Sequence, residues 1–429
     1  MNTTHGKLNS SAGSRMNFGW ALAAGLMIIL PAAIALHTKL WVLTSISVGF
    51  LFGFFLQKGD LCGASAFSEV ILMRDARKLK GLGIAILVSM SSIAIMHRLG
   101  WVNLTPKPFL LLNYAVGGAI FGSGMVLAGG CISGCIYKSA MGNLNSMVAL
   151  LGIPLGIAFV EYGPLHPWSV SLSQVKISSS DGSALTLSSL THLSFGAITL
   201  VLIMLTLVSV WLQRRRRAPR KVRKEEGKWS PVKLLTSSWK PWQAGVAIGL
   251  LAGPAFLSSM HSGRNYPLGV SHGMLQVSQL LTDNHHQYVW RMEPVKAPGD
   301  TIVTSTTAPV STAGITATSP VKTPSPKKIV WWLVGVVLSM GAGAHIAARL
   351  SHQFKLLPKP PEQTIIAVVG GLLVGVGAGF ANGCVVGNIL SGWALQSAGL
   401  LVFGIVTILA NWAVTYIYLM GGRLLPKRK

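Results

Sequence analysis

Runs of about twenty apolar residues recur along this sequence and restrict its fold more than any other feature. About twenty helical residues cover the hydrocarbon core of a bilayer. The runs lie at about 18–37, 41–57, 81–98, 109–128, 146–162, 190–212, 242–258, 329–348, 364–381 and 399–420. Only 11% of the residues are charged, whereas a soluble domain carries about a quarter. The sequence therefore predicts an all-α polytopic membrane protein with about ten transmembrane helices.

The positive charge has a topological explanation. The formal net charge is +25, which could indicate nucleic-acid binding. The cations gather instead in short stretches beside apolar runs, chiefly at 74–80, 214–240 and 423–429. Such clusters mark cytoplasmic loops. We therefore expect no nucleic-acid partner, a multi-pass chain in the lipid bilayer, both termini in the cytoplasm, and a retained first span rather than a cleaved signal peptide.

Two glycine-spaced apolar runs, at 122–135 and 375–388, each end in a Gly-Cys pair that is followed by another glycine. The positions concerned are Gly130, Cys131, Gly134, Gly383, Cys384 and Gly387. Glycine is costly inside a helix. Both runs are therefore predicted to be broken helices whose backbone comes close to something.

Four stretches are too short to cross a membrane and are predicted to be re-entrant. They are 58–73 with Cys62, 131–143, 263–276 and the segment at Cys384. The order span, re-entrant, span, span, re-entrant, span occurs in 41–162 and again in 242–420. The span at 190–212 inverts the second copy, so we predict two inverted repeats with a binding site at their interface.

The remaining parts of the chain are expected to connect or flank these repeats. Residues 1–40 form a tail and an extra span, and 163–241 form an external loop, a connecting span and a basic cytoplasmic loop. Within the second repeat, 283–328 is polar and rich in Thr, Ser and Pro, so it is predicted to be a disordered external loop. Residues 421–429 form a basic cytoplasmic tail.

The chemistry of the re-entrant pieces suits an anion. Backbone that is not helical within a bilayer must line a polar cavity or be buried in protein. Short helices that start there point free N–H groups and a partial positive charge at the cavity. A thiol is a weak donor that can touch an anion without trapping it. For each cysteine taken alone, the alternative is an ordinary small packing residue.

Cys135 leaves a second chemistry open. It lies four residues after Cys131 and could share a helix face with it, as a redox or metal pair. A lone C-x3-C motif without nearby His or acid partners is a weak metal signal, so we predict no metal, no cofactor and no catalytic residue. Asn388 stands at the equivalent position of the second run, which favours a packing role for Cys135.

Several polar residues flank the predicted path. Lys58 could belong to a cytoplasmic mouth or to a solvated edge. Arg264 could attract anions at an outer mouth or lie at the membrane interface with its head in water. His272 could form a gate or be a hydrogen-bonded polar group, and Tyr266 lies in the same non-spanning piece.

Four motifs resemble the YeeE/YedE family of sulfur transporters over most of residues 41–420. They are Lys58-Gly-Asp-Leu-Cys62, Gly129-Gly-Cys131-Ile-Ser-Gly, Tyr266-Pro-Leu-Gly-Val-Ser-His-Gly273 and Asn382-Gly-Cys384-Val-Val-Gly. The resemblance implies inverted repeats around an hourglass path lined by Cys62, Cys131 and Cys384, with Cys131 nearest the middle. It also implies that thiosulfate passes between the thiols through S–H hydrogen bonds, without covalent chemistry.

The expected function is therefore uptake of thiosulfate, or a closely related small sulfur-containing anion, across a bacterial inner membrane. The chain is not expected to be an enzyme, and it has no nucleotide-binding motif for ATP-driven transport. By the same resemblance, a TusA-like sulfur-carrier protein could dock on the 213–240 loop. Transport of selenium or other sulfur compounds, a thiol relay through Cys131 and Cys135, and a scaffold for a sulfur-transfer protein remain alternatives.

Overall fold

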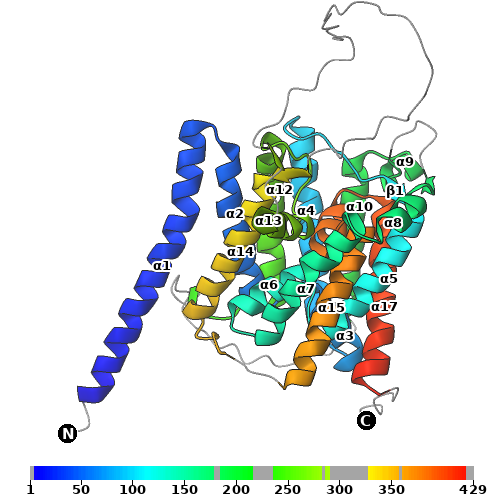
Figure 1. Ribbon diagram of the computed structural model, residues 1–429. Coiled ribbons are helices and arrows are strands. Elements are labelled where there is room, and N and C mark those ends of the chain that lie inside the picture. Colours follow the sequence, from blue (N-terminus) through cyan, green and yellow to red (C-terminus); the bar gives the residue numbers. More distant parts are fainter. Residues whose placement is uncertain are drawn as a thin grey trace, which may run out of the picture.

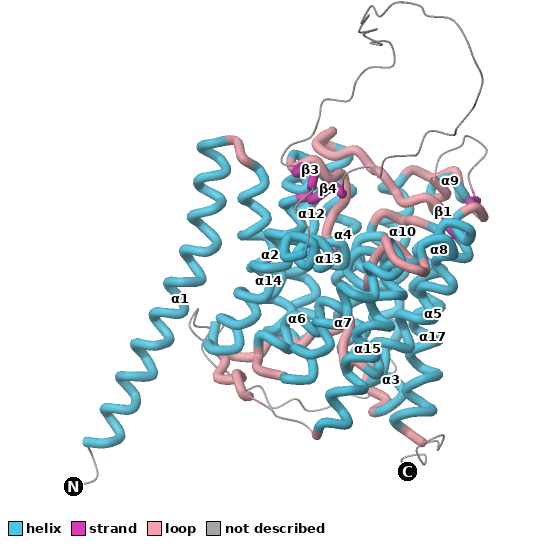
Figure 2. Tube along the Cα trace, viewed as in Figure 1, coloured by secondary structure: helices cyan, strands magenta, loops and turns pink. Residues whose placement is uncertain are grey.

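Long helices packed side by side make up almost the whole computed structural model (Figures 1 and 2). The structure describes residues 4–177, 184–215, 235–282, 286–289, 327–356 and 360–421. Within these residues, 10 helices are long and apolar enough to cross a membrane. This confirms the predicted fold class. The predicted 213–240 loop, 283–328 loop and 421–429 tail lie largely outside the described residues.

The long helices follow the apolar runs closely. They are α1 (Thr4–Thr38), α2 (Thr44–Gly59), α4 (Arg77–Arg98), α5 (Leu111–Leu127), α7 (Leu144–Glu161), α10 (Phe195–Arg215), α12 (Pro241–His261), α14 (Trp331–Leu350), α15 (Pro361–Phe380) and α17 (Ala398–Val414). Two boundaries differ most from the prediction. Helix α1 begins well before residue 18, and α10 begins after residue 190, because a capped short helix precedes it.

Short helices lie between the long ones. Four of them fall in or beside the predicted re-entrant stretches: α3 (Gly63–Leu72), α6 (Ile132–Ala140), α13 (Ser271–Thr282), and η2 (Val385–Ser391) continued by α16 (Gly392–Ala394). The others are η1 (Trp41–Leu43), α8 (His166–Ser173), α9 (Leu187–Thr191) and η3 (Thr415–Leu419). The polar 163–189 stretch, expected to be a loop, thus contains helical turns.

The strands are short and peripheral. β1 (Phe109–Leu110) pairs antiparallel with β2 (Lys176–Ile177), and β3 (His286–Val289) pairs in parallel with β4 (Lys327–Val330). They connect loops at the upper end of Figure 2 and do not contribute to the membrane-crossing bundle.

Glycines inside the long helices allow close packing. A Cβ at Gly375 of α15 would lie 2.1 Å from the carbonyl oxygen of Ile153 in α7, and one at Gly371 would lie 2.2 Å from that of Ala149. Small residues let membrane helices approach this closely. The glycine-spaced run at 375–388 is continuous helix as far as Phe380, and the helix breaks within the run, between Phe380 and Val385.

Helix contacts define the bundle. Helix α2 packs against α14, α4 against α12, α7 against α15, and α5 against both α15 and α17. Helix α1 packs mainly against α2, α14 and η1 and leans away from the bundle in Figure 1, and only 11% of its candidate span is buried. The four cysteines are buried in the core between the other helices.

Candidate functional site

The same local structure places each of the three cysteines that the motifs single out. Two residues before each cysteine the chain adopts a left-handed conformation, at Asp60 (φ 45°), Gly129 (φ 68°) and Asn382 (φ 51°). Glycine, Asn and Asp are the residues that enter this region most readily. Each left-handed residue therefore ends a long helix, as such residues commonly do.

Each cysteine is then the N-cap of the following short helix. Cys62, Cys131 and Cys384 have extended backbones and precede α3, α6 and η2 directly. Their carbonyl oxygens accept hydrogen bonds from residue i+4, at 2.8, 2.7 and 2.7 Å respectively. Three thiols are thus held at helix N-termini, where free N–H groups and the helix dipole favour negative charge.

Cys62 and Cys131 come together in the core. Their sulfurs are 3.9 Å apart, and the Cys131 sulfur is 3.3 Å from the hydroxyl oxygen of Ser133. Gly134 makes room for this pair: a Cβ there would lie 2.3 Å from the Cys62 sulfur and 3.5 Å from the Cys131 sulfur. The predicted glycine therefore has a defined role, which is to let two thiols meet.

The Cys384 segment packs against the Cys62 segment. A Cβ at Gly63 would lie 2.8 Å from a methyl carbon of Val385. Gly63, Ser133 and Val385 all border a cavity of about 20 Å³, which is close to the least volume that holds one water molecule. The three segments therefore meet at this small cavity, whose other lining residues are apolar and which none of the cysteines borders.

Beside the Cys384 segment lies a group of polar residues that we call the Lys107 cluster: Lys107, Arg264, Tyr266 and Asn388. The Lys107 ammonium donates to the side-chain oxygen of Asn388 at 3.0 Å and lies 5.1 Å from the centre of the Tyr266 ring. The Tyr266 hydroxyl donates to the carbonyl oxygen of Gly387 at 2.7 Å. Burial, with Arg264 nearby, lowers the pKa of Lys107 to about 7.

Arg264 completes this cluster. Its guanidinium donates to the carbonyl oxygens of Tyr266 and Pro267, at 3.2 and 2.8 Å, and faces the rings of Tyr266 and Trp332. Lys107 was missed in the sequence, because no motif contains it. The sequence offers one indication of its role: Lys107 is a cation between Pro106 and Pro108, in the short loop before the span that leads to Cys131.

A second polar group, the Lys78 cluster, joins the Cys62 and Cys131 segments and consists of Asp60, Glu69, Lys78 and Tyr137. The Lys78 ammonium is 2.6 Å from a carboxylate oxygen of Asp60 and 2.6 Å from one of Glu69. The Tyr137 hydroxyl donates to Asp60 at 2.8 Å. These bonds tie the turn before Cys62 to α4 and α6.

The remaining predicted residues have other neighbours. Lys58 is buried and donates to the carbonyl oxygen of Leu235 and to the Ser351 hydroxyl, so it ties α2 to two loops and is not a solvated edge. The backbone N–H of Cys135 donates to the carbonyl oxygen of Cys131. A Cβ at Gly130 would crowd Cys135, and a Cβ at Gly383 would crowd Asn388.

His272 lies in a separate hollow. Its ring nitrogen is 3.2 Å from a carboxylate oxygen of Glu161. Both residues border a cavity of about 380 Å³ that also reaches Asn382, whose carbonyl oxygen accepts a hydrogen bond from Lys107. Within the described ranges, no group of three or more His, Cys, Asp or Glu side chains is placed to hold a metal ion.

In the part of the chain that the structure describes, ten membrane-length helices and buried thiols at helix breaks define a polytopic membrane protein of the transporter class. The model of the sulphur transport family matches residues 58–413. The chain belongs to this family, which confirms the resemblance predicted from the four motifs.

Curated relatives agree with this assignment. A thiosulfate transporter TsuA of Spirochaeta thermophila is 29% identical over 383 residues, which cover 87% of this chain and 98% of that protein. The TsuA of Escherichia coli is 25% identical over 379 residues, covering 88% and 94%. The probable transporter YedE of Escherichia coli is 28% identical over 147 residues, about a third of each chain.

Proposed function

We propose that this protein carries thiosulfate across the membrane along a path on which Cys62, Cys131 and Cys384 lie. The observation that carries the proposal is the pair of buried thiols 3.9 Å apart, each at the N-terminus of a short helix. The similarity to proteins named thiosulfate transporters supplies the substrate. No residue is assigned a catalytic role.

The charge distribution supports an anion as substrate. Lys107 and Arg264 lie beside the Cys384 segment, and cations at a mouth raise the local concentration of anions. Farther in, thiols at helix N-termini contact the anion without trapping it, and the cation of Lys138 lies beside them and donates to the carbonyl oxygen of Gly129. Thiol hydrogen bonds suffice for this hand-over, and no bond to sulfur forms or breaks.

The helix contacts support the inverted repeats. If α2–α7 correspond in order to α12–α17, exchanging the halves converts the α2–α14 contact into α12–α4, and α7–α15 into α17–α5. All four pairs pack together, and so do α6 with α14 and its counterpart η2 with α4. We infer that α3 and α6 re-enter from one side of the membrane, and α13 and η2 from the other.

The cations support the orientation. The two chain ends lie at the same end of the bundle in Figure 1. Lys78 and the exposed Lys355 lie in or next to the short loops at that end. By the positive-inside rule this end is cytoplasmic, and in a bacterium the membrane is the inner one. The Lys107 cluster then faces outside and the Lys78 cluster inside.

We infer that the proposed path is closed in this conformation. The cavity of about 20 Å³ beside Ser133 and Val385 has room for about one water molecule and not for an oxyanion of sulfur. Passage therefore requires the three cysteine segments to separate. The predicted TusA-like partner would dock at the 213–240 loop, most of which lies outside the described residues, so docking remains a prediction.

Uptake by the purified protein in lipid vesicles tests the proposal. Radiolabelled thiosulfate should accumulate inside vesicles that contain the protein and not inside empty ones. An excess of unlabelled thiosulfate should abolish the signal, and an excess of sulfate, which lacks the outer sulfur, should reduce it much less. Equal competition by selenite would instead favour a selenium compound as substrate. Absence of uptake despite a correctly inserted protein would contradict the proposal.

A further inference from the structure

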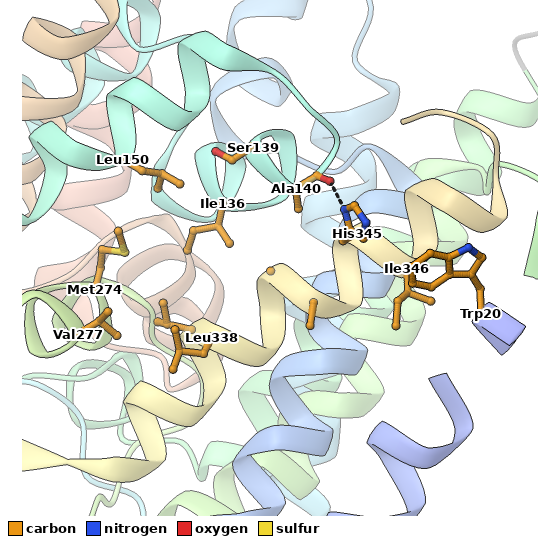
Figure 3. Close-up of a pocket in the computed structure, with 13 residues that line it drawn as sticks. Trp20, Ile136, Ser139, Ala140, Leu150, Met274, Val277, Leu338, His345 and Ile346 are labelled. Atoms are coloured by element: carbon orange, nitrogen blue, oxygen red, sulfur yellow. Dashed lines mark hydrogen bonds between the residues drawn. The ribbon is translucent and has the colours of Figure 1, made fainter. Parts of the chain in front are cut away.

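An apolar groove of about 620 Å³ runs along α14 on the surface of the bundle. Figure 3 shows Trp20 and Ile346 at one end, Met274 and Val277 at the other, and Ile136 of α6 on the opposite wall. None of the four cysteines borders it. Leu338 in the groove is 60% exposed, so the groove opens outward. In a membrane, that opening faces the hydrocarbon.

The dimensions of the groove suit one lipid chain. Its lining extends along α14 from Val337 to Ile346, which is roughly 14 Å at the rise of an α-helix. The hydrocarbon core of a bilayer is about 30 Å thick, so the groove covers about one leaflet. A volume of several hundred Å³ is typical of small-molecule sites.

The end of the groove near the Lys78 side of the bundle is basic. His345 bonds to the carbonyl oxygen of Ala140 at 2.9 Å, the dashed line in Figure 3, and Arg349 lies 3.3 Å from its other ring nitrogen. Arg349 is exposed and stacks on Phe354 at 3.9 Å. Among the described residues, no carboxylate pairs with Arg349.

Lys355 adds a second exposed cation at the same end. Its backbone N–H donates to the carbonyl oxygen of Met141 at 3.0 Å, directly after α6. Arg349 thus lies one helical turn beyond His345 of the groove, and Lys355 lies next to the residue that follows α6, so two exposed cations lie beyond this end of the groove. Basic pockets between transmembrane helices on the cytoplasmic side bind anionic lipid headgroups, and a guanidinium matches the oxygens of a phosphate.

We propose that this groove binds an anionic phospholipid, with one acyl chain along α14 and the headgroup at Arg349 and Lys355. The bound chain packs against Ile136 and Ala140, which belong to the helix that begins after Cys131. The lipid therefore supports α6, the short helix that follows Cys131, on a face that none of the cysteines borders.

Lipid binding to the purified protein tests this without reference to transport. Native mass spectrometry would compare retention of phosphatidylglycerol and phosphatidylcholine. Gly341→Phe fills the groove, because a Cβ there meets its first neighbour, a methyl of Ile136, only at 4.0 Å. We expect it to reduce phosphatidylglycerol retention about tenfold or more. Gly83→Phe on α4, where a Cβ meets nothing within 4 Å, is the matched control and should retain the lipid.

The headgroup site is tested by Arg349→Gln and Lys355→Gln. Each should weaken phosphatidylglycerol retention roughly fivefold, the factor that corresponds to about 1 kcal/mol per basic residue, and leave phosphatidylcholine unchanged. Should Gly341→Phe fail to fold, Ala342→Leu narrows the same groove. Unchanged retention in the groove variants would overturn the proposal. So would a dimer that dissociates in Gly341→Phe, because a second copy of the chain would then fill the groove.

Discussion

Replacing Gly134 with alanine tests the thiol pair at the point where it is most crowded. The added methyl would lie 2.3 Å from the Cys62 sulfur, whereas ordinary contacts start at 3.4 Å. The Cys62 sulfur or its loop must therefore move by about 1 Å to make room for the methyl, because the densely packed core has no empty space beside Gly134. We expect that displacement to break the 3.9 Å contact with Cys131.

The size of the effect follows from overpacking. An extra methyl in a packed core costs about 1–3 kcal/mol. The bundle should tolerate that loss and stay folded. If the same strain acts on the barrier to anion passage, the uptake rate falls roughly fivefold to 150-fold, since about 1.4 kcal/mol is a factor of ten.

The assay is initial uptake of radiolabelled thiosulfate into vesicles of equal protein content. Gly83→Ala is the control, because a Cβ at Gly83 meets no atom within 4 Å. Its rate should equal that of the unmutated protein, and thermal unfolding should show both variants folded. A folded Gly134→Ala protein that transports at the unmutated rate would refute the role given to the thiol pair.

Two further substitutions, at Lys107 beside the Cys384 segment and at Gly387 within it, probe this segment. Because the pKa of Lys107 is lowered to about 7, its positive charge is present below that pH and lost above it. The KM for thiosulfate should therefore rise between about pH 6 and pH 8. Lys107→Arg stays charged over this range and should flatten the rise in KM. His272→Gln is the control for the neighbouring hollow and should show the same rise in KM as the unmutated protein. Identical pH profiles for the unmutated protein, Lys107→Arg and His272→Gln would show that Lys107 is not on the path. Gly387 is buried, yet a Cβ there meets nothing within 4 Å, so Gly387→Leu should fill that interior space and block uptake without unfolding. Unimpeded uptake by Gly387→Leu would place the space off the path.

The membrane bundle could be predicted from the sequence because a long apolar run has few alternatives. Each span needs about twenty apolar residues whatever it packs against. The turns at the cysteines were also signalled, since Gly129 and Asn382 before Cys131 and Cys384 are residues that readily take left-handed conformations.

The partners of these segments could not be predicted in the same way. Lys107 meets Asn388 across 281 positions of sequence, and no local pattern reports such a contact. Lys58, which opens the first motif, could be predicted only as part of a mouth or of a solvated edge; its burial and its hydrogen bond to Ser351 at the end of α14 follow from tertiary packing. The glycines at 375–388 signalled a break in the helix, which falls after Phe380, but they did not reveal that Gly371 and Gly375 pack α15 against α7. Each of these outcomes depends on tertiary packing.

The central claim is that the anion passes the thiol of Cys131, and a matched pair of cysteine variants tests it most directly. Both Cys131 and Cys135 are fully buried, so Cys131→Ala and Cys135→Ala remove the same atom from similar surroundings. In the vesicle assay with labelled thiosulfate, Cys131→Ala should lose most of its uptake and Cys135→Ala should keep most of it. Equal uptake by Cys131→Ala and the unmutated protein, with both folded, would contradict the account.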